Sequence, residues 1–124
     1  MARLPRNFIP NLPQHVVQRG NNRQVIFVGD DDRRRYLACL AKASSRYECA
    51  IHAFVLMSNH VHLLLTPAQR DAVSVMMQSI GRSYVRYFNG RHACSDTLWE
   101  GRFKAALVES ERYFLTYTRY IELM

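Results

Sequence analysis

The chain has 124 residues, of which 48% are hydrophobic and 22% are charged, a composition typical of one folded domain and not of a disordered protein. Lysine and arginine outnumber aspartate and glutamate by 17 to 10, which gives a formal net charge of +7, and only Lys42 and Lys104 are lysines. Because guanidinium groups bind phosphate through paired hydrogen bonds and stack on bases, the arginine-rich surplus favours a nucleic-acid partner. A generically basic soluble protein is the alternative.

The cysteines and the amino-terminal residues bear on where the protein works. Cys39, Cys49 and Cys94 are odd in number and lack C-x-x-C spacing, which indicates thiols in a reducing compartment. Residues 1–13 contain no apolar core of signal-peptide length, and no stretch of the chain reaches the length of a membrane span. We therefore expect a cytoplasmic protein that has no membrane partner.

A strand and a basic turn are the first elements predicted. Residues 1–13 carry three of the four prolines and predict an irregular arm, and His15–Gln18 predicts a short strand. The turn that follows, Arg19–Arg23, contains Gly-Asn-Asn, whose residues accept left-handed backbone conformations, between two arginines. Its amides and charges could hold a phosphate, and an ordinary solvated turn is the alternative.

A helix follows the apolar run 25–28. Three aspartates at positions 30–32 favour a helix N-terminus, and apolar residues at helical spacing from Tyr36 to Tyr47 predict a helix of about 16 residues. The three arginines at positions 33–35 are explained most simply as its solvated face.

Two strands joined by a short turn are predicted next, and the second contains two histidines. The strands cover residues 49–56 and a run around 60–65. Alternate side chains of a strand point to opposite faces, so His60 and His62 share one face, with Cα atoms roughly 6.5 Å apart. Both imidazoles could then reach one divalent cation. The alternative is that one histidine fills a core site while the other is half exposed.

The second half of the chain predicts a helix that opens at Asp71, carries an apolar stripe over 73–88 and ends at Gly90. Arg82 and Arg86 lie four apart on another face of this helix, where they could contact a phosphate backbone. A strand is predicted over 103–108, after a tight turn or bulge at Gly101.

A last helix is predicted from about residue 111 to the end of the chain. Tyr113, Tyr117, Tyr120 and Met124 fall on one stripe of it. Such a stripe usually packs with its hydroxyls hydrogen-bonded, so it does not by itself nominate a nucleophile. The whole order predicts one α+β domain over 1–124, a ferredoxin-like antiparallel sheet with helices packed on one face.

Four segments together resemble the single-tyrosine HUH transposases, specifically the branch of REP-associated tyrosine transposases. They are His15-Val-Val-Gln-Arg-Gly-Asn-Asn-Arg-Gln24, Met57-Ser-Asn-His-Val-His-Leu-Leu64, Leu98-Trp-Glu-Gly-Arg-Phe103, and Ser110-Glu-Arg-Tyr113 with Tyr120-Ile-Glu-Leu123. The resemblance runs in the same order from about residue 13 to the end of the chain.

This resemblance implies a DNA transposase that cleaves and rejoins single-stranded DNA. It implies that His60 and His62 hold Mg²⁺ or Mn²⁺, and that Tyr120 attacks the scissile phosphate to form a 5′-phosphotyrosine, with Tyr117 as the competing candidate. The implied substrate is a single strand beside an imperfect DNA hairpin. The residues that we expect to contact DNA are Arg19, Asn21, Asn22, Arg23, Arg82, Arg86, Arg102 and Lys104.

Two positions depart from the family pattern. Ser58 stands where the family often has proline, which should affect only the turn. Met124 stands where the family has its third metal ligand, usually Asn or Gln, and a thioether is a poor ligand for Mg²⁺. Either the chain is a truncated form, or the metal site is incomplete and activity is weakened. Water could fill the position.

Two other functions stay open at this stage. One is a non-catalytic module that binds single-stranded nucleic acid on the same sheet. The other is a small metal-dependent hydrolase that uses His60 and His62 to activate water, without a covalent intermediate. Some relatives act as dimers and others alone, so a homodimer is an open expectation.

Overall fold

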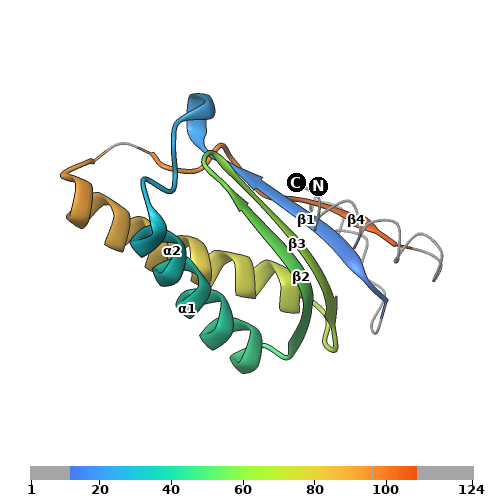
Figure 1. Ribbon diagram of the computed structural model, residues 1–124. Helices are drawn as coiled ribbons and strands as arrows, with labels where there is room; N and C mark the ends of the chain where they lie inside the picture. The colour runs from blue at the N-terminus through green and yellow to red at the C-terminus, as the bar shows by residue number, and fades with distance from the viewer. Residues whose placement is uncertain (1–11, 96, 109–124) are drawn as a thin grey trace, which may run out of the picture.

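The computed structural model describes residues 12–95 and 97–108. Four strands, β1 (Gln14–Arg19), β2 (Cys49–Met57), β3 (His60–Pro67) and β4 (Lys104–Leu107), form an antiparallel sheet in the order β2-β3-β1-β4. Helices α1 (Asp30–Arg46) and α2 (Ala72–His92) lie together on one side of it (Figure 1). The predicted α+β, ferredoxin-like fold is confirmed, whereas the predicted tyrosine-bearing helix lies outside the described residues.

The two faces of the sheet have different roles. Val16, Leu63 and Leu65 point toward the helices and are fully buried in the main core with Met76 and Ile80 of α2. On the other face, a much smaller apolar cluster surrounds Leu64 and Val108. Because side chains alternate along a strand, the residues between the core positions of β1 and β3 face away from the helices. This second face is the one that carries the histidines.

The β2–β3 hairpin confirms the prediction of two strands with a turn at Ser58-Asn59. The Ser58 carbonyl accepts hydrogen bonds from the amides of Ile26 and Phe27, at 2.7 and 3.2 Å. The apolar run 25–28 therefore pairs with the turn rather than with a strand, and it buries Ile26 and Phe27 while its outer residues are exposed. It closes one end of the core.

Asp32 ties the start of α1 to the end of α2. Its buried carboxylate accepts hydrogen bonds from the Val28 amide (2.8 Å), the Tyr87 hydroxyl (2.7 Å) and the His92 ring (2.8 Å). Burial by itself would raise the pKa of Asp32, but these hydrogen bonds, with the His92 charge, hold that pKa below its usual value. Tyr87 of α2 is half-buried, and its hydroxyl reaches this carboxylate.

The predicted end of the second helix at Gly90 is wrong. Helix α2 continues to His92, and Ala93 takes the left-handed conformation (φ 52°) that closes it. Gly90 has helical neighbours on both sides and no need of a positive φ. The His92 bond to Asp32 favours the two additional residues, because it holds the His92 side chain against the start of α1.

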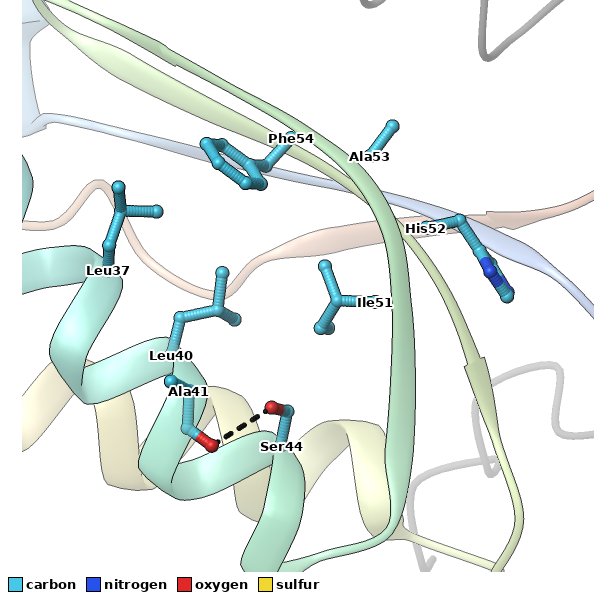
Figure 2. Close-up of a pocket in the computed structure, with 8 residues that line it drawn as sticks. All are labelled: Leu37, Leu40, Ala41, Ser44, Ile51, His52, Ala53 and Phe54. Atoms are coloured by element: carbon cyan, nitrogen blue, oxygen red, sulfur yellow. Dashed lines mark hydrogen bonds between the residues drawn. The ribbon is translucent and has the colours of Figure 1, made fainter.

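A hollow of about 610 Å³ lies beside the edge strand β2. Leu37, Leu40 and Ile51 line it, and Figure 2 shows that His52, which also belongs to its lining, points away from the helix. His52 instead contacts the Thr66 hydroxyl at 2.7 Å. The hollow is apolar and on the helix side, so it offers no chemistry to the histidine face.

Within the described parts of the chain, no helix is both long and apolar enough to cross a membrane.

Gly20 joins β1 to the basic turn, and we expect Gly20→Ala to destabilise the protein. A Cβ at this position would meet the Gln24 carbonyl oxygen and would lie 2.9 Å from Cγ2 of the buried Ile26. Overpacking of this kind costs about 1–3 kcal/mol in the free energy of unfolding, which urea denaturation measures. Gly90→Ala is the matched control, because nothing lies within 4 Å of its Cβ and a helical alanine should stabilise by about 0.5–1 kcal/mol. Equal stabilities of the two variants would contradict this packing.

Candidate metal and nucleic-acid site

His60 and His62 lie side by side on the face of β3 that points away from the helices. Their ring centroids are 4.9 Å apart and the rings are nearly perpendicular, at 74°. His62 is buried, with 7% of its surface exposed, and His60 is half-buried. The alternation predicted for this strand therefore places both imidazoles in one patch.

The neighbouring strand brings a third histidine to the same patch. Val17 of β1 is paired with His62, so His15 projects on the same face two residues away. The His15 Nε2 and His62 Nδ1 atoms are 2.9 Å apart, and the two rings meet edge to edge, with planes 16° apart and centroids separated by 5.2 Å. Sequence reasoning placed His15 on a strand but did not include it in the site, because the β1–β3 pairing was not known.

Burial keeps the three imidazoles neutral. It lowers the pKa of His62 to about 4, helped by the charges of His15, His60 and Arg19. Burial also lowers the pKa of His15, and burial together with Arg19 lowers that of His60. Neutral imidazole is the form that ligates metal ions, so the patch is in the right protonation state near neutral pH.

The donor chemistry of this pair fits a divalent cation. The Nδ1 atom of His60 lies 2.7 Å from the Asn59 side-chain oxygen, which can only accept, so His60 carries its proton on Nδ1 and its lone pair on Nε2. Among residues 12–95 and 97–108, no three His, Cys, Asp or Glu side chains are placed to hold one metal ion. His60 and His62 would thus supply two ligands, and Met124 lies outside the described residues.

Two of the cations predicted to contact DNA lie on this histidine face. Arg19, at the end of β1, is exposed and is paired with His60. Lys104, at the start of β4, is exposed and is paired with Val17, which in turn is paired with His62. Paired residues of neighbouring strands project on the same face, so both positive charges border the imidazoles.

The turn with Asn21, Asn22 and Arg23 stands at the end of β1 beside the β2–β3 turn. Of the Gly-Asn-Asn residues predicted to accept left-handed conformations, Asn22 (φ 53°) takes one, whereas Gly20 is extended (φ −70°). The second left-handed residue is Arg23 (φ 59°), and both Asn22 and Arg23 are exposed. The Asn21 amide donates to the Leu98 carbonyl at 2.8 Å, and the Gly20 amide donates to Asn59 at 2.9 Å. The bonds to Leu98 and to Asn59, the residue before His60, thus hold the basic turn next to the histidines.

The other three predicted cations are placed elsewhere. Arg82 and Arg86 are exposed on α2, which packs on the opposite face of the sheet. Arg102 lines a hollow of about 620 Å³ with Gln18 and Gln78, also on the helix side. The structure therefore does not bring these three arginines together with His60 and His62, and their contact with DNA stays a prediction.

Two solved structures share this fold. A REP-associated tyrosine transposase bound to a REP hairpin superposes with a TM-score of 0.78 at 18% identity, over 99% of this chain and 72% of the other. A protein of Deinococcus radiodurans described as a candidate transposase superposes with a TM-score of 0.64 at 16% identity, over 98% of this chain and 97% of the other. Comparison with curated proteins gives no match.

The family described as "Transposase IS200 like" matches residues 9–123, nearly the whole chain. The protein therefore belongs to the IS200-like transposase family, and its general function is DNA transposition. The family resemblance stated from the four sequence segments is confirmed.

Proposed function

We propose that this transposase cleaves and rejoins single-stranded DNA beside a hairpin through a 5′-phosphotyrosine on Tyr120. The observation that carries the proposal is the pair of neutral imidazoles, His60 and His62, bordered by Arg19 and Lys104 on the sheet face that points away from the helices. Two nitrogen ligands beside two cations suit a phosphodiester, whose charge both the metal and the cations offset.

His60 and His62 would hold Mg²⁺ or Mn²⁺ through their Nε2 atoms. When bound, the ion would polarise the scissile phosphate and offset the charge that develops on it. Asn59 keeps the His60 ring in position through its side-chain oxygen. Arg19 lies next to His60 and would pair with a phosphate oxygen.

Tyr120 is assigned as the nucleophile from the family resemblance, since it lies outside the described residues. Its phenol oxygen would form a bond to phosphorus while the bond from phosphorus to the 3′ oxygen breaks. The products are a free 3′ hydroxyl and DNA joined to the enzyme through its 5′ phosphate. Because a phosphodiester is exchanged for a phosphodiester, rejoining requires no nucleotide cofactor.

The basic turn would hold the DNA backbone next to this site. Asn22 and Arg23 are exposed and Asn21 is half-buried, so this turn presents amide and guanidinium groups at the end of the sheet where Asn59 and His60 lie. Such a surface binds phosphates without requiring a particular sequence. One of the solved neighbours is bound to a REP hairpin, which supports a hairpin as the substrate of this chain.

The proposal is tested with a hairpin oligonucleotide that has single-stranded flanks, labelled at its 3′ end or its 5′ end. With Mn²⁺, the 3′ label should remain on the protein through SDS electrophoresis, whereas the 5′ label should leave on a fragment with a 3′ hydroxyl. Cleavage without an adduct would favour the metal-dependent hydrolase. Salt-sensitive binding that neither cleaves DNA nor responds to Mn²⁺ would favour the non-catalytic binding module.

A further inference from the structure

His15 approaches His62 in a way that constrains where His62 carries its proton. The two atoms that meet are His15 Nε2 and His62 Nδ1, 2.9 Å apart, and the ring planes differ by only 16° with centroids 5.2 Å apart, so the rings meet edge to edge with both nitrogens in line. Both residues lie on central strands that are paired along their length, so the backbone does not let either ring move far. A hydrogen bond at this distance needs one proton between the two nitrogens.

Only two arrangements of neutral rings satisfy that requirement. If His15 donates from Nε2, then Nδ1 of His62 is the acceptor and the proton of His62 sits on Nε2, where it blocks ligation by that atom. If His62 donates from Nδ1, then His15 accepts on Nε2 and the lone pair of His62 is on Nε2. The second arrangement gives His62 the tautomer that the Asn59 oxygen already imposes on His60.

We propose that His15 is a positioning residue that accepts the Nδ1–H of His62 and so holds the His62 lone pair on Nε2. The inference rests on the proposed function in one respect, namely that His62 ligates a metal ion. A neighbour that accepts the second ring proton of a ligating histidine fixes both its tautomer and its orientation. Here the acceptor is itself an imidazole, contributed by an adjacent strand, and its ring lies edge to edge and nearly coplanar with the ring that it orients.

The chain offers a clean pair of substitutions. His15→Gln places an amide oxygen close to the position of Nε2 and can still accept from His62, whereas His15→Phe keeps an aromatic ring at this position without an acceptor. In the metal-free, full-length protein, ring ¹⁵N shifts from long-range NMR correlations report which nitrogen of His62 carries the proton. We expect an Nδ1–H tautomer in the wild type and in His15→Gln, and a shift toward Nε2–H in His15→Phe.

Mn²⁺ affinity, measured by calorimetry without DNA, gives the second readout. Loss of such a neighbour typically weakens metal binding about 10–100-fold, so His15→Phe should show that loss and His15→Gln should recover most of it. Thermal unfolding identifies a variant that fails to fold, and the wild-type spectrum remains decisive in that case. An Nε2–H tautomer of His62 in the wild type, or an unchanged tautomer in folded His15→Phe, would overturn the proposal.

The two readouts separate this inference from the proposed function. If the wild type shows the Nδ1–H tautomer and His15→Phe loses it, His15 positions His62 even where no Mn²⁺ binds. A failure of Mn²⁺ binding in that setting counts against the metal-dependent chemistry alone.

Discussion

Replacing Tyr120 by phenylalanine is expected to abolish the covalent protein–DNA adduct while leaving hairpin binding unchanged. Phenylalanine keeps the ring but lacks the oxygen that would bond to phosphorus, and loss of the nucleophile of a covalent enzyme lowers the rate by at least about 10³-fold. The measurement is SDS electrophoresis of the 3′-labelled hairpin with Mn²⁺, followed by peptide mass mapping of the adduct. Binding is followed separately by fluorescence anisotropy.

Tyr117→Phe and Tyr113→Phe are the matched controls, since each removes one hydroxyl from the same predicted stripe. Both should retain the adduct, and the modified peptide should contain position 120. An adduct that survives in Tyr120→Phe and disappears in Tyr117→Phe would move the nucleophile one turn earlier. An adduct that forms in all three variants would show that none of these tyrosines is the nucleophile.

Replacing His60 or His62 by alanine is expected to have the second large effect. Each substitution removes a ring from the imidazole pair, so Mn²⁺ affinity should fall by more than the roughly 10–100-fold cost of losing a ligand's hydrogen-bonding neighbour. Adduct formation should be lost at Mn²⁺ concentrations that saturate the wild type. DNA binding should persist, because Arg19 and the basic turn remain.

His52→Ala is the control for this experiment. His52 is an exposed histidine on the same sheet, but it contacts Thr66 and does not belong to the patch around His62. Its variant should bind Mn²⁺ and form the adduct as the wild type does. Full adduct formation by His60→Ala at low Mn²⁺, or equal losses in His52→Ala, would show that the imidazole pair is not the metal site.

Local patterns were enough to predict most of the fold. The alternation around His60 and the apolar spacing in α1 and α2 each reflect contacts close in sequence, and the structure has these elements. The end of α2 was wrong because it depends on a distant contact, the bond from His92 to Asp32, and not on Gly90. These two side chains are 60 residues apart, so a local sequence pattern around Gly90 does not reveal their contact.

Of the histidine patch, only the part that one strand contains was predictable. His60 and His62 are two residues apart, so strand geometry alone places them together. His15 is 47 residues from His62, and it joins the site because β1 pairs with β3 instead of β2. The available signal for His15 was its place on a predicted strand, on the same face as Val17 and Arg19. Arg82 and Arg86 have the right charge, but α2 packs against the opposite face of the sheet.

The sheet order also has a consequence for how the protein folds. The β2–β3 hairpin closes through a two-residue turn and can form in microseconds, so His60 and His62 become neighbours early. β1 reaches β3 only after the chain has closed a much longer loop, which is a slower event. A nascent or partly refolded chain would therefore possess both imidazoles before His15 docks against them. The contact with His15 that orients the His62 ring would therefore form at a late stage of folding.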